Sequence, residues 1–379
     1  MLPLGTAAFL AFGVLLVLLG ANQADLARDL DLDLTRSGLL GSALALGVGV
    51  GLVGAGPIFD RYPRRPLFVG STLLVGLSLV SVDASMDFGR TVAHVMLAGL
   101  GAGAYDTLIN AAMVERFGDR AAKPMSAVHS AATLGAMLGP FAIGWIAAEA
   151  HWTASFQWTG AAHLALAAAA LFTKFPAPER SLPRDPALPG EATAGGPVLS
   201  TALLPLAWIA FAYVGVEAAM TIFAIPYASG GLLLGADRGR IAISAFWCGL
   251  FVGRLGLLAV RGSPGAQVLI AAGVTGAATL AIGVGWIDNA IEVLFGIVGV
   301  ALGAVYPLMM TLTGQRFPHA RGMAAGLVGA AGALGGLCIP WLTGAIGDGI
   351  GIVPAVATLA CWSLSLGFAA MFARGPGRA

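Results

Sequence analysis

The chain has 379 residues, of which 58% are apolar and only 10% are charged, and its mean hydropathy is +0.87. Water-soluble domains carry about 25% charged residues, so this composition excludes an ordinary soluble core and indicates that lipid covers much of the surface. A net charge of +1 offers no basic face for nucleic acid. The three cysteines, Cys248, Cys338 and Cys361, lie singly in apolar runs and form neither a disulfide framework nor a metal-ligand spacing.

Apolar runs long enough to cross a membrane recur along the whole chain. Because a spanning helix needs about 20 mostly apolar residues, we predict twelve spans in an all-α membrane protein. They cover residues 3–22, 37–58, 66–83, 91–114, 124–147, 154–174, 201–227, 240–260, 265–285, 289–313, 322–346 and 351–373. The first run lacks a preceding basic stretch and is followed by many more runs, which indicates an uncleaved helix rather than a signal peptide.

One connection differs from the others. Residues 175–199 are rich in proline, glycine and charge, a composition typical of an irregular linker. This segment divides the spans six and six. We therefore predict an N-terminal six-helix bundle over residues 1–174, a cytoplasmic linker over 175–199, and a C-terminal six-helix bundle over 200–379.

The two halves also resemble each other in sequence. The pairs that match at one constant offset are Arg116-Phe117 with Arg316-Phe317, Gly135 with Gly335, Pro140 with Pro340 and Gly144 with Gly344. Chance matching in a chain rich in glycine and alanine is the alternative, but the constant offset and the shared loop position favour a repeat. Such pseudo-symmetric halves are typical of transporters that rock around a central site.

Lysine and arginine residues predict the orientation in the membrane. With both termini inside, fourteen of them fall in inside loops and five in outside loops. Positively charged loops face the cytoplasm. We therefore expect a multi-pass protein of the cell (inner) membrane with both termini in the cytoplasm.

The loop between the second and third spans carries a motif. It has Gly56, then three residues, then Asp60-Arg61, and ends in the basic pair Arg64-Arg65. A plain positively charged loop is the alternative reading. This pattern resembles the loop signature of the major facilitator superfamily, which implies two six-helix bundles and transport by alternating access. We assign Asp60, Arg61, Arg64 and Arg65 to gating, together with Arg254 in the eighth span.

Polar residues inside spans are costly in lipid and mark candidate sites. Asp106 and Asn110 are four residues apart in the fourth span, so they share one helix face. His129, near the start of the fifth span, lies at a similar depth to Asn110. We expect these three residues to form a cluster, either for proton coupling or as a structural hydrogen-bonded knot.

The second half contributes two more charged residues. Glu217 lies near the middle of the seventh span, and Arg254 lies in the eighth span, seven residues before Arg261. Glu217 is a candidate for proton coupling and solute binding, with a single structural hydrogen bond as the alternative. Arg254 either reaches toward the cytoplasm or pairs with a carboxylate.

These polar stretches resemble one branch of the superfamily, the fucose–galactose–glucose:proton symporters and related fucose-permease-like proteins. The matching stretches run from Tyr105 to Asn110, from Ser126 to His129, from Tyr213 to Glu217, and over Phe246-Trp247 with Gly253-Arg254. The resemblance implies that Asp106 takes the proton, where the characterised fucose transporter has a glutamate. In the first span this chain offers only the amides Asn22 and Gln23, where that transporter has an aspartate.

From these observations we expect a proton-coupled secondary transporter of a small solute, such as a sugar or a related polar metabolite. Proton coupling is assigned to Asp106, Glu217 and His129. The predicted solute-binding residues are Asn22, Gln23, Tyr105, Asn110, Tyr213, Glu217, Tyr227 and Trp247. No phosphate-binding Gly-Lys-Ser/Thr loop and no nucleophile–base or metal-ligand spacing occurs, so we expect no cofactor, no metal, no ATP-driven pump and no enzyme.

Three alternatives stay open at this stage. A proton-driven exporter of drugs or metabolites is favoured by Gly139-Pro140 in the fifth span, which resembles a motif of several exporters. A uniporter and a membrane-embedded enzyme are the other two. The expected partners are the solute, protons and the lipid bilayer, and we expect a monomer that binds no nucleic acid.

Overall fold

The computed structural model describes residues 1–59, 61–117, 120, 122–175, 201–256, 262–283, 290–317 and 321–373. Asp60, Arg261 and residues 176–199 of the predicted linker lie outside these ranges. Every regular element within the described ranges is helical. The helices of the first half are α1 (Leu2–Ala21), α2 (Gln23–Asp29), α3 (Leu34–Phe59), α4 (Arg64–Val80), α5 (Phe88–Phe117), α6 (Ala122–Glu149) and α7 (Thr153–Leu171).

The second half repeats this series, but two of its spans are interrupted. Its helices are η3 (Thr201–Leu203), α8 (Leu204–Pro226), η4 (Tyr227–Gly231), α9 (Ala236–Gly256), α10 (Pro264–Gly283), α11 (Ile291–Gly303), α12 (Val305–Arg316), α13 (Arg321–Ile350) and α14 (Ile352–Ala373). One interrupted span passes from α8 into η4, and the other is divided into α11 and α12. The predicted tenth span is therefore two helices that meet at Ala304. Pro307 explains this break, because its ring nitrogen has no hydrogen to donate to the carbonyl of Gly303.

The helices are long and apolar enough for a membrane protein. Within the described ranges, nine helical segments have the length and hydropathy needed to cross a bilayer. Of the remaining long helices, α4 has 17 residues and α9 carries Asp237, Arg238, Arg240 and Arg254. Both pack into the bundle with the apolar helices, as α7 does. The arrangement accounts for all twelve predicted spans, with α11 and α12 together forming the tenth.

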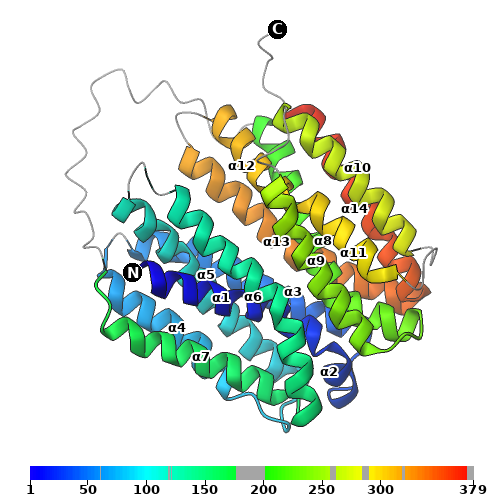
Figure 1. The fold of residues 1–379 in the computed structure, drawn as a ribbon, viewed down its shortest axis with the longest axis horizontal. Coiled ribbons are helices and arrows are strands. Elements are labelled where there is room, and N and C mark those ends of the chain that lie inside the picture. The colour runs from blue at the N-terminus through cyan, green and yellow to red at the C-terminus, as the bar shows by residue number, and fades with distance from the viewer. Residues whose placement is uncertain are drawn as a thin grey trace.

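The same three helix pairings recur in each half (Figure 1). In the first half α1 packs along α6, α3 along α5 and α4 along α7. The second half pairs α8 with α13, α9 with α11 and α10 with α14. The helices drawn from blue to green therefore gather on one side of the molecule, and those drawn from green to red gather on the other.

Glycines at matching positions allow the closest of these pairings. At Gly135 on α6 a side chain would overlap the backbone oxygen of Leu10 on α1. At Gly335, the matching position on α13, it would overlap the backbone oxygen of Phe211 on α8. Small residues at helix contacts let membrane helices approach backbone to backbone. The constant offset between the halves in the sequence therefore corresponds to a repeated helix contact in the structure.

Among the described residues, the two halves meet tightly at one end. We call the end that bears Asp25, Thr35, Arg240 and Asp348 the distal end, and the end that bears Met1, Arg64 and Glu115 the terminal end. At the distal end Asp348 on α13 accepts hydrogen bonds from the backbone nitrogens of Leu34 (2.9 Å) and Thr35 (2.8 Å), the first residues of α3. Arg240 on α9 pairs with Asp25 at 3.5 Å and donates to the backbone oxygen of Ala21 at 3.1 Å.

This contact continues along α3 and α13 and then stops. Ser42 donates a hydrogen bond to the backbone oxygen of Leu337, and Gly49 lies against Ala333. Nearer the terminal end, a Cβ atom at Gly54 on α3 or at Gly326 or Gly329 on α13 would have no heavy atom within 4 Å. Among the described residues, the two halves are therefore closed together at the distal end, and α3 and α13 lie apart at these glycines nearer the terminal end.

Candidate functional site

A chain of hydrogen bonds links three polar residues of the first half. Asn110 Nδ2 donates to Asp106 Oδ1 at 2.9 Å, as expected for residues one turn apart on α5. The His129 Nε2 atom on α6 lies 3.1 Å from Asn110 Oδ1. The structure therefore brings Asp106, Asn110 and His129 together in the cluster that was expected from their similar depth in the membrane.

The second half presents a carboxyl group and a guanidinium to the same region. Tyr213 and Glu217 lie one turn apart on α8, and both interact electrostatically with Arg254 on α9. Within the described ranges, Glu217 Oε2 and Tyr213 Oη are buried without a hydrogen-bond partner. The two side chains are close to each other but outside hydrogen-bond geometry. A ligand with hydroxyl or amino hydrogens would satisfy the carboxylate oxygen.

The two sets of residues are joined across the interface between the halves. Arg254 Nη1 donates to Thr133 Oγ1 on α6 at 2.8 Å. Tyr306 on α12 packs its ring 5.9 Å from that of Tyr213 and interacts electrostatically with Asp106. We use the name central polar cluster for Asp106, Asn110, His129, Thr133, Tyr213, Glu217, Arg254 and Tyr306. It combines two carboxyl groups, an imidazole and a guanidinium, which are the groups needed to exchange protons and to hold a polar solute.

Two members of the cluster, Thr133 and Tyr306, were not predicted. Thr133 follows His129 by one helical turn, so its place on the same face of α6 was visible in the sequence. A threonine inside a span is common, however, and most bond only their own helix. Tyr306 gave no signal apart from its position directly before Pro307.

Three of the predicted solute-binding residues, all in the first half, lie outside this cluster. Tyr105 is buried in the first half, where its hydroxyl is 3.2 Å from His163 Nε2, because residue 105 points to a different face of α5 from Asp106. Asn22 donates to Ser155 Oγ at 2.9 Å, and Gln23 donates to Ser37 Oγ at 2.5 Å. Both of these amides are at the distal end rather than at the depth of the cluster.

Tyr227 and Trp247 are the remaining predicted residues of the second half. The Tyr227 hydroxyl donates to the backbone oxygen of Ile282 on α10, so this side chain bonds within its own half. Trp247 on α9 is 4% exposed, and its Nε1 atom has no hydrogen-bond partner among the described residues. Of the two, Trp247 keeps a donor available for a ligand.

The predicted gating loop lies at the terminal end. Arg64, at the start of α4, is buried and forms an ion pair with Glu115 at the end of α5. Arg65 donates to the backbone oxygen of Thr173 at 3.0 Å, and Arg61 is exposed. These bonds hold helices of the first half to one another. Asp60 lies outside the described residues.

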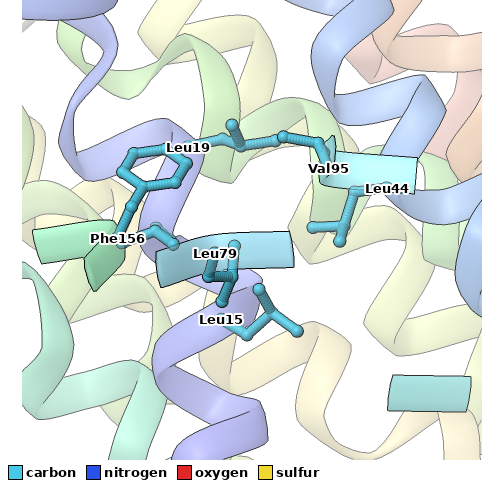
Figure 2. A pocket seen from close by; sticks show the side chains of 7 residues that line it. Leu15, Leu19, Leu44, Leu79, Val95 and Phe156 are labelled. Carbon is cyan, nitrogen blue, oxygen red and sulfur yellow. The ribbon is translucent and has the colours of Figure 1, made fainter. Parts of the chain in front are cut away.

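A small pocket inside the first half is entirely apolar (Figure 2). The side chains that line it include Leu15, Leu19, Leu44, Leu79, Val95 and Phe156. It offers no hydrogen-bond donor or acceptor from a side chain. A polar solute would gain nothing there, so the central polar cluster is the better candidate site.

Comparison with known proteins decides the family. Residues 4–337 match the family model described as Major Facilitator Superfamily. The chain belongs to this superfamily. The family is one of transporters, and the nine apolar helical segments among the described residues agree with a multi-pass membrane protein. The predicted family and the all-helical membrane fold are both confirmed.

Solved structures of superfamily members share the fold over nearly the whole chain. A structure of the nucleoside transporter NupG superposes with a TM-score of 0.77 at 13% identity, covering 97% of this chain and 98% of that one. A D-xylose–proton symporter gives a TM-score of 0.77 at 15% identity and covers 98% of this chain and 96% of that one.

Curated relatives match over shorter stretches. The mouse protein named sodium-dependent glucose transporter 1A is 28% identical over 141 residues, which is 35% of this chain and 32% of that protein. The matched stretch thus spans about a third of this relative. Its name is consistent with the resemblance to sugar symporters seen in the sequence.

Proposed function

We propose that the chain is a proton-coupled secondary transporter of a small polar solute, such as a sugar or a related metabolite. The observation that supports this most is the central polar cluster, in which titratable residues of both halves meet where the halves separate. The relatives named for sugar and nucleoside transport support the same class of solute. Rocking of the two halves would expose the cluster first to one side of the membrane and then to the other.

Each half has its own part in this proposal. Asp106 carries the proton, because a coupling carboxyl must ionise in one state and be neutral in the other. Asn110 and His129 hold its orientation. Glu217, Tyr213 and Trp247 bind the solute from the second half, since each of them has a buried polar atom without a protein partner in the described ranges. In the state seen here the described residues of the two halves are bonded together at the distal end.

The proposed setting is the cell (inner) membrane, with the terminal end in the cytoplasm and the chain acting as a monomer. The excess of lysine and arginine in the loops of the terminal end supports this orientation. A reporter fusion inserted in the linker over residues 175–199 should report a cytoplasmic location. A periplasmic signal from that fusion would reverse the proposed orientation.

Two other modes of transport have specific support. Gly139-Pro140 within α6 resembles an exporter motif, which favours a proton-driven exporter. The name of the mouse relative favours sodium as the coupling ion. A uniporter would need no ion at all. Imposed pH and sodium gradients of either polarity distinguish all of these from a proton-coupled importer.

The test begins with a thermal-shift screen of purified protein against sugars, polyols, nucleosides, organic acids and lipophilic cations. Uptake of the best ligand is then measured in proteoliposomes with and without a pH gradient. Asp106→Asn keeps the shape of the side chain but fixes it neutral, so it should abolish accumulation and leave binding and exchange intact. Full accumulation by Asp106→Asn would remove Asp106 from the coupling role.

A further inference from the structure

Thr133 occupies the point where the polar groups of the two halves touch. Its side chain is 1% exposed, and its hydroxyl donates to the backbone oxygen of His129 at 3.3 Å. The same hydroxyl oxygen accepts the hydrogen bond from Arg254 Nη1 at 2.8 Å. Because the hydroxyl has one hydrogen and two acceptor positions, both bonds form at once. Thr133 therefore ties α9 of the second half to the segment of α6 that carries His129.

Arg254 lies between partners on opposite sides of the interface. In its own half it faces the carboxyl of Glu217 and the hydroxyls of Tyr213 and Tyr306. In the other half it faces Thr133 and the imidazole of His129. A guanidinium and a carboxylate inside a membrane protein would ordinarily pair directly. Here the guanidinium bonds to Thr133 instead, while Glu217 Oε2 has no partner within the described ranges.

We propose that Thr133 is a positioning residue that holds Arg254 away from Glu217 and so keeps one carboxylate oxygen free for the solute. When the bond to Thr133 is lost, the guanidinium moves onto Glu217 and occupies the acceptor that the solute needs. Because the bond crosses the interface, its formation depends on how the halves are arranged. The availability of Glu217 is thereby linked to the state with the distal end closed. The inference rests on the proposed role of Glu217 in solute binding.

The test measures the reactivity of Glu217 and needs no knowledge of the solute. Purified full-length protein is treated with dicyclohexylcarbodiimide, which modifies buried carboxylic acids that are not paired with a cation. Modification at Glu217 is quantified by peptide mass spectrometry, and modification at Asp106 in the same sample serves as the reference. Thr133→Val should lower modification of Glu217 about tenfold, the size expected for one hydrogen bond to a charged group, and leave Asp106 unchanged. Thr133→Ser should restore it.

Two controls separate positioning from general damage. Thr343 on α13 is equally buried and donates to the backbone oxygen of Ile339 on its own helix, so Thr343→Val should leave Glu217 as reactive as before. In an Arg254→Gln background, Thr133→Val should have no further effect, because the group that it positions is gone.

Three results would overturn the proposal. They are absence of modification at Glu217 in the unsubstituted protein, full reactivity in Thr133→Val, and an effect of Thr133→Val that persists without Arg254. A transport assay run in parallel keeps the two proposals apart. A chain that shows no gradient-driven uptake contradicts proton-coupled transport, whereas the labelling result concerns only the placement of Arg254.

Discussion

Some polar residues of this chain bond to partners within their own half, and others keep a buried polar atom without a partner among the described residues. Tyr105 and Tyr227 belong to the first kind, because their hydroxyls bond to partners on neighbouring helices. Glu217 and Trp247 belong to the second, since each has a buried polar atom without a partner in the described residues. Buried polar atoms are normally satisfied, so those left open are the better markers of a binding site.

Glu217→Gln tests whether the unpartnered carboxylate of Glu217 binds the solute. The substitution keeps the size of the side chain but removes the charge that strengthens a hydrogen bond to the solute. We expect the dissociation constant to rise about tenfold, which corresponds to roughly 1.4 kcal/mol. Equilibrium binding of the solute found by the thermal-shift screen provides the measurement. Glu149→Gln, at an exposed acid on α6, is the matched control, and equal binding by both variants would exclude Glu217 from the site.

A second residue-scale prediction concerns Asp29 at the distal end, outside the spans. Burial opposes ionisation of Asp29, but hydrogen bonds from Trp152 Nε1 (2.7 Å) and Arg28 Nε (2.9 Å) outweigh it, so the pKa of Asp29 lies below its ordinary value. A carboxyl with a lowered pKa contributes stability above its unfolded pKa, and this contribution is lost as pH falls through the folded pKa.

The melting temperature should therefore fall as pH drops below about 4, and Asp29→Asn should reduce that dependence on pH. Thermal unfolding in detergent between pH 6 and pH 3 measures the effect. Asp31→Asn, at an exposed aspartate nearby, should leave the pH profile unchanged. An identical profile for Asp29→Asn and the unsubstituted protein would contradict the assigned role of these hydrogen bonds.

At the scale of helices, the fold is a repeated set of close backbone contacts. Gly103 on α5 lies against the backbone oxygen of Val48 on α3, and its counterpart in the second half, Gly303, lies against that of Leu250 on α9. The spans and their repeat were predictable, because apolar length and glycine spacing are properties of local sequence. The separation of α11 from α12 was not predicted, although Pro307 was its visible cause.

Alanine substitutions test these contacts. Gly135→Ala and Gly335→Ala each place a methyl group onto a backbone oxygen of the neighbouring helix, so each should destabilise the protein by about 1–3 kcal/mol. Gly54→Ala meets no atom within 4 Å and should be neutral or stabilising, because alanine favours the helix. Melting temperatures of the purified variants give the comparison. Equal melting temperatures for all three variants would show that the paired helices can move apart at little cost in free energy.

The whole molecule is held in one arrangement by bonds at the distal end. Asp348 on α13 caps the first turn of α3, although the two residues that it bonds are 313 and 314 positions away in the chain. A capping side chain contributes about 1 kcal/mol to its helix. Here the cap belongs to the other half, so opening the distal end must break it. The cap therefore favours the state in which the distal end is closed.

Asp348→Ala should shift the protein about fivefold toward the state with the distal end open. Ser42→Cys, at a position that is 1% exposed between α3 and α13, reports this opening through its rate of maleimide labelling in a variant without the three native cysteines. Asp33→Ala removes a cap that α3 receives from its own half, through the backbone nitrogen of Arg36 at 2.6 Å, and should not raise the rate. Equal labelling rates for the two variants would mean that Asp348 does not hold the distal end closed.

The sequence by itself determined the membrane class, the positions of the spans, the repeat of one half in the other and the shared face of Asp106 and Asn110. All of these follow from local hydropathy and helical periodicity, which any stretch of sequence carries alone. Only the tertiary structure decided that Arg254 bonds to Thr133, that Asp348 caps α3, and that Tyr105 and Asn22 are turned away from the cluster. Those outcomes depend on which faces of distant helices pack together. Packing depends on how the surfaces of two whole helices fit together, so it cannot be predicted from the sequence of one segment alone.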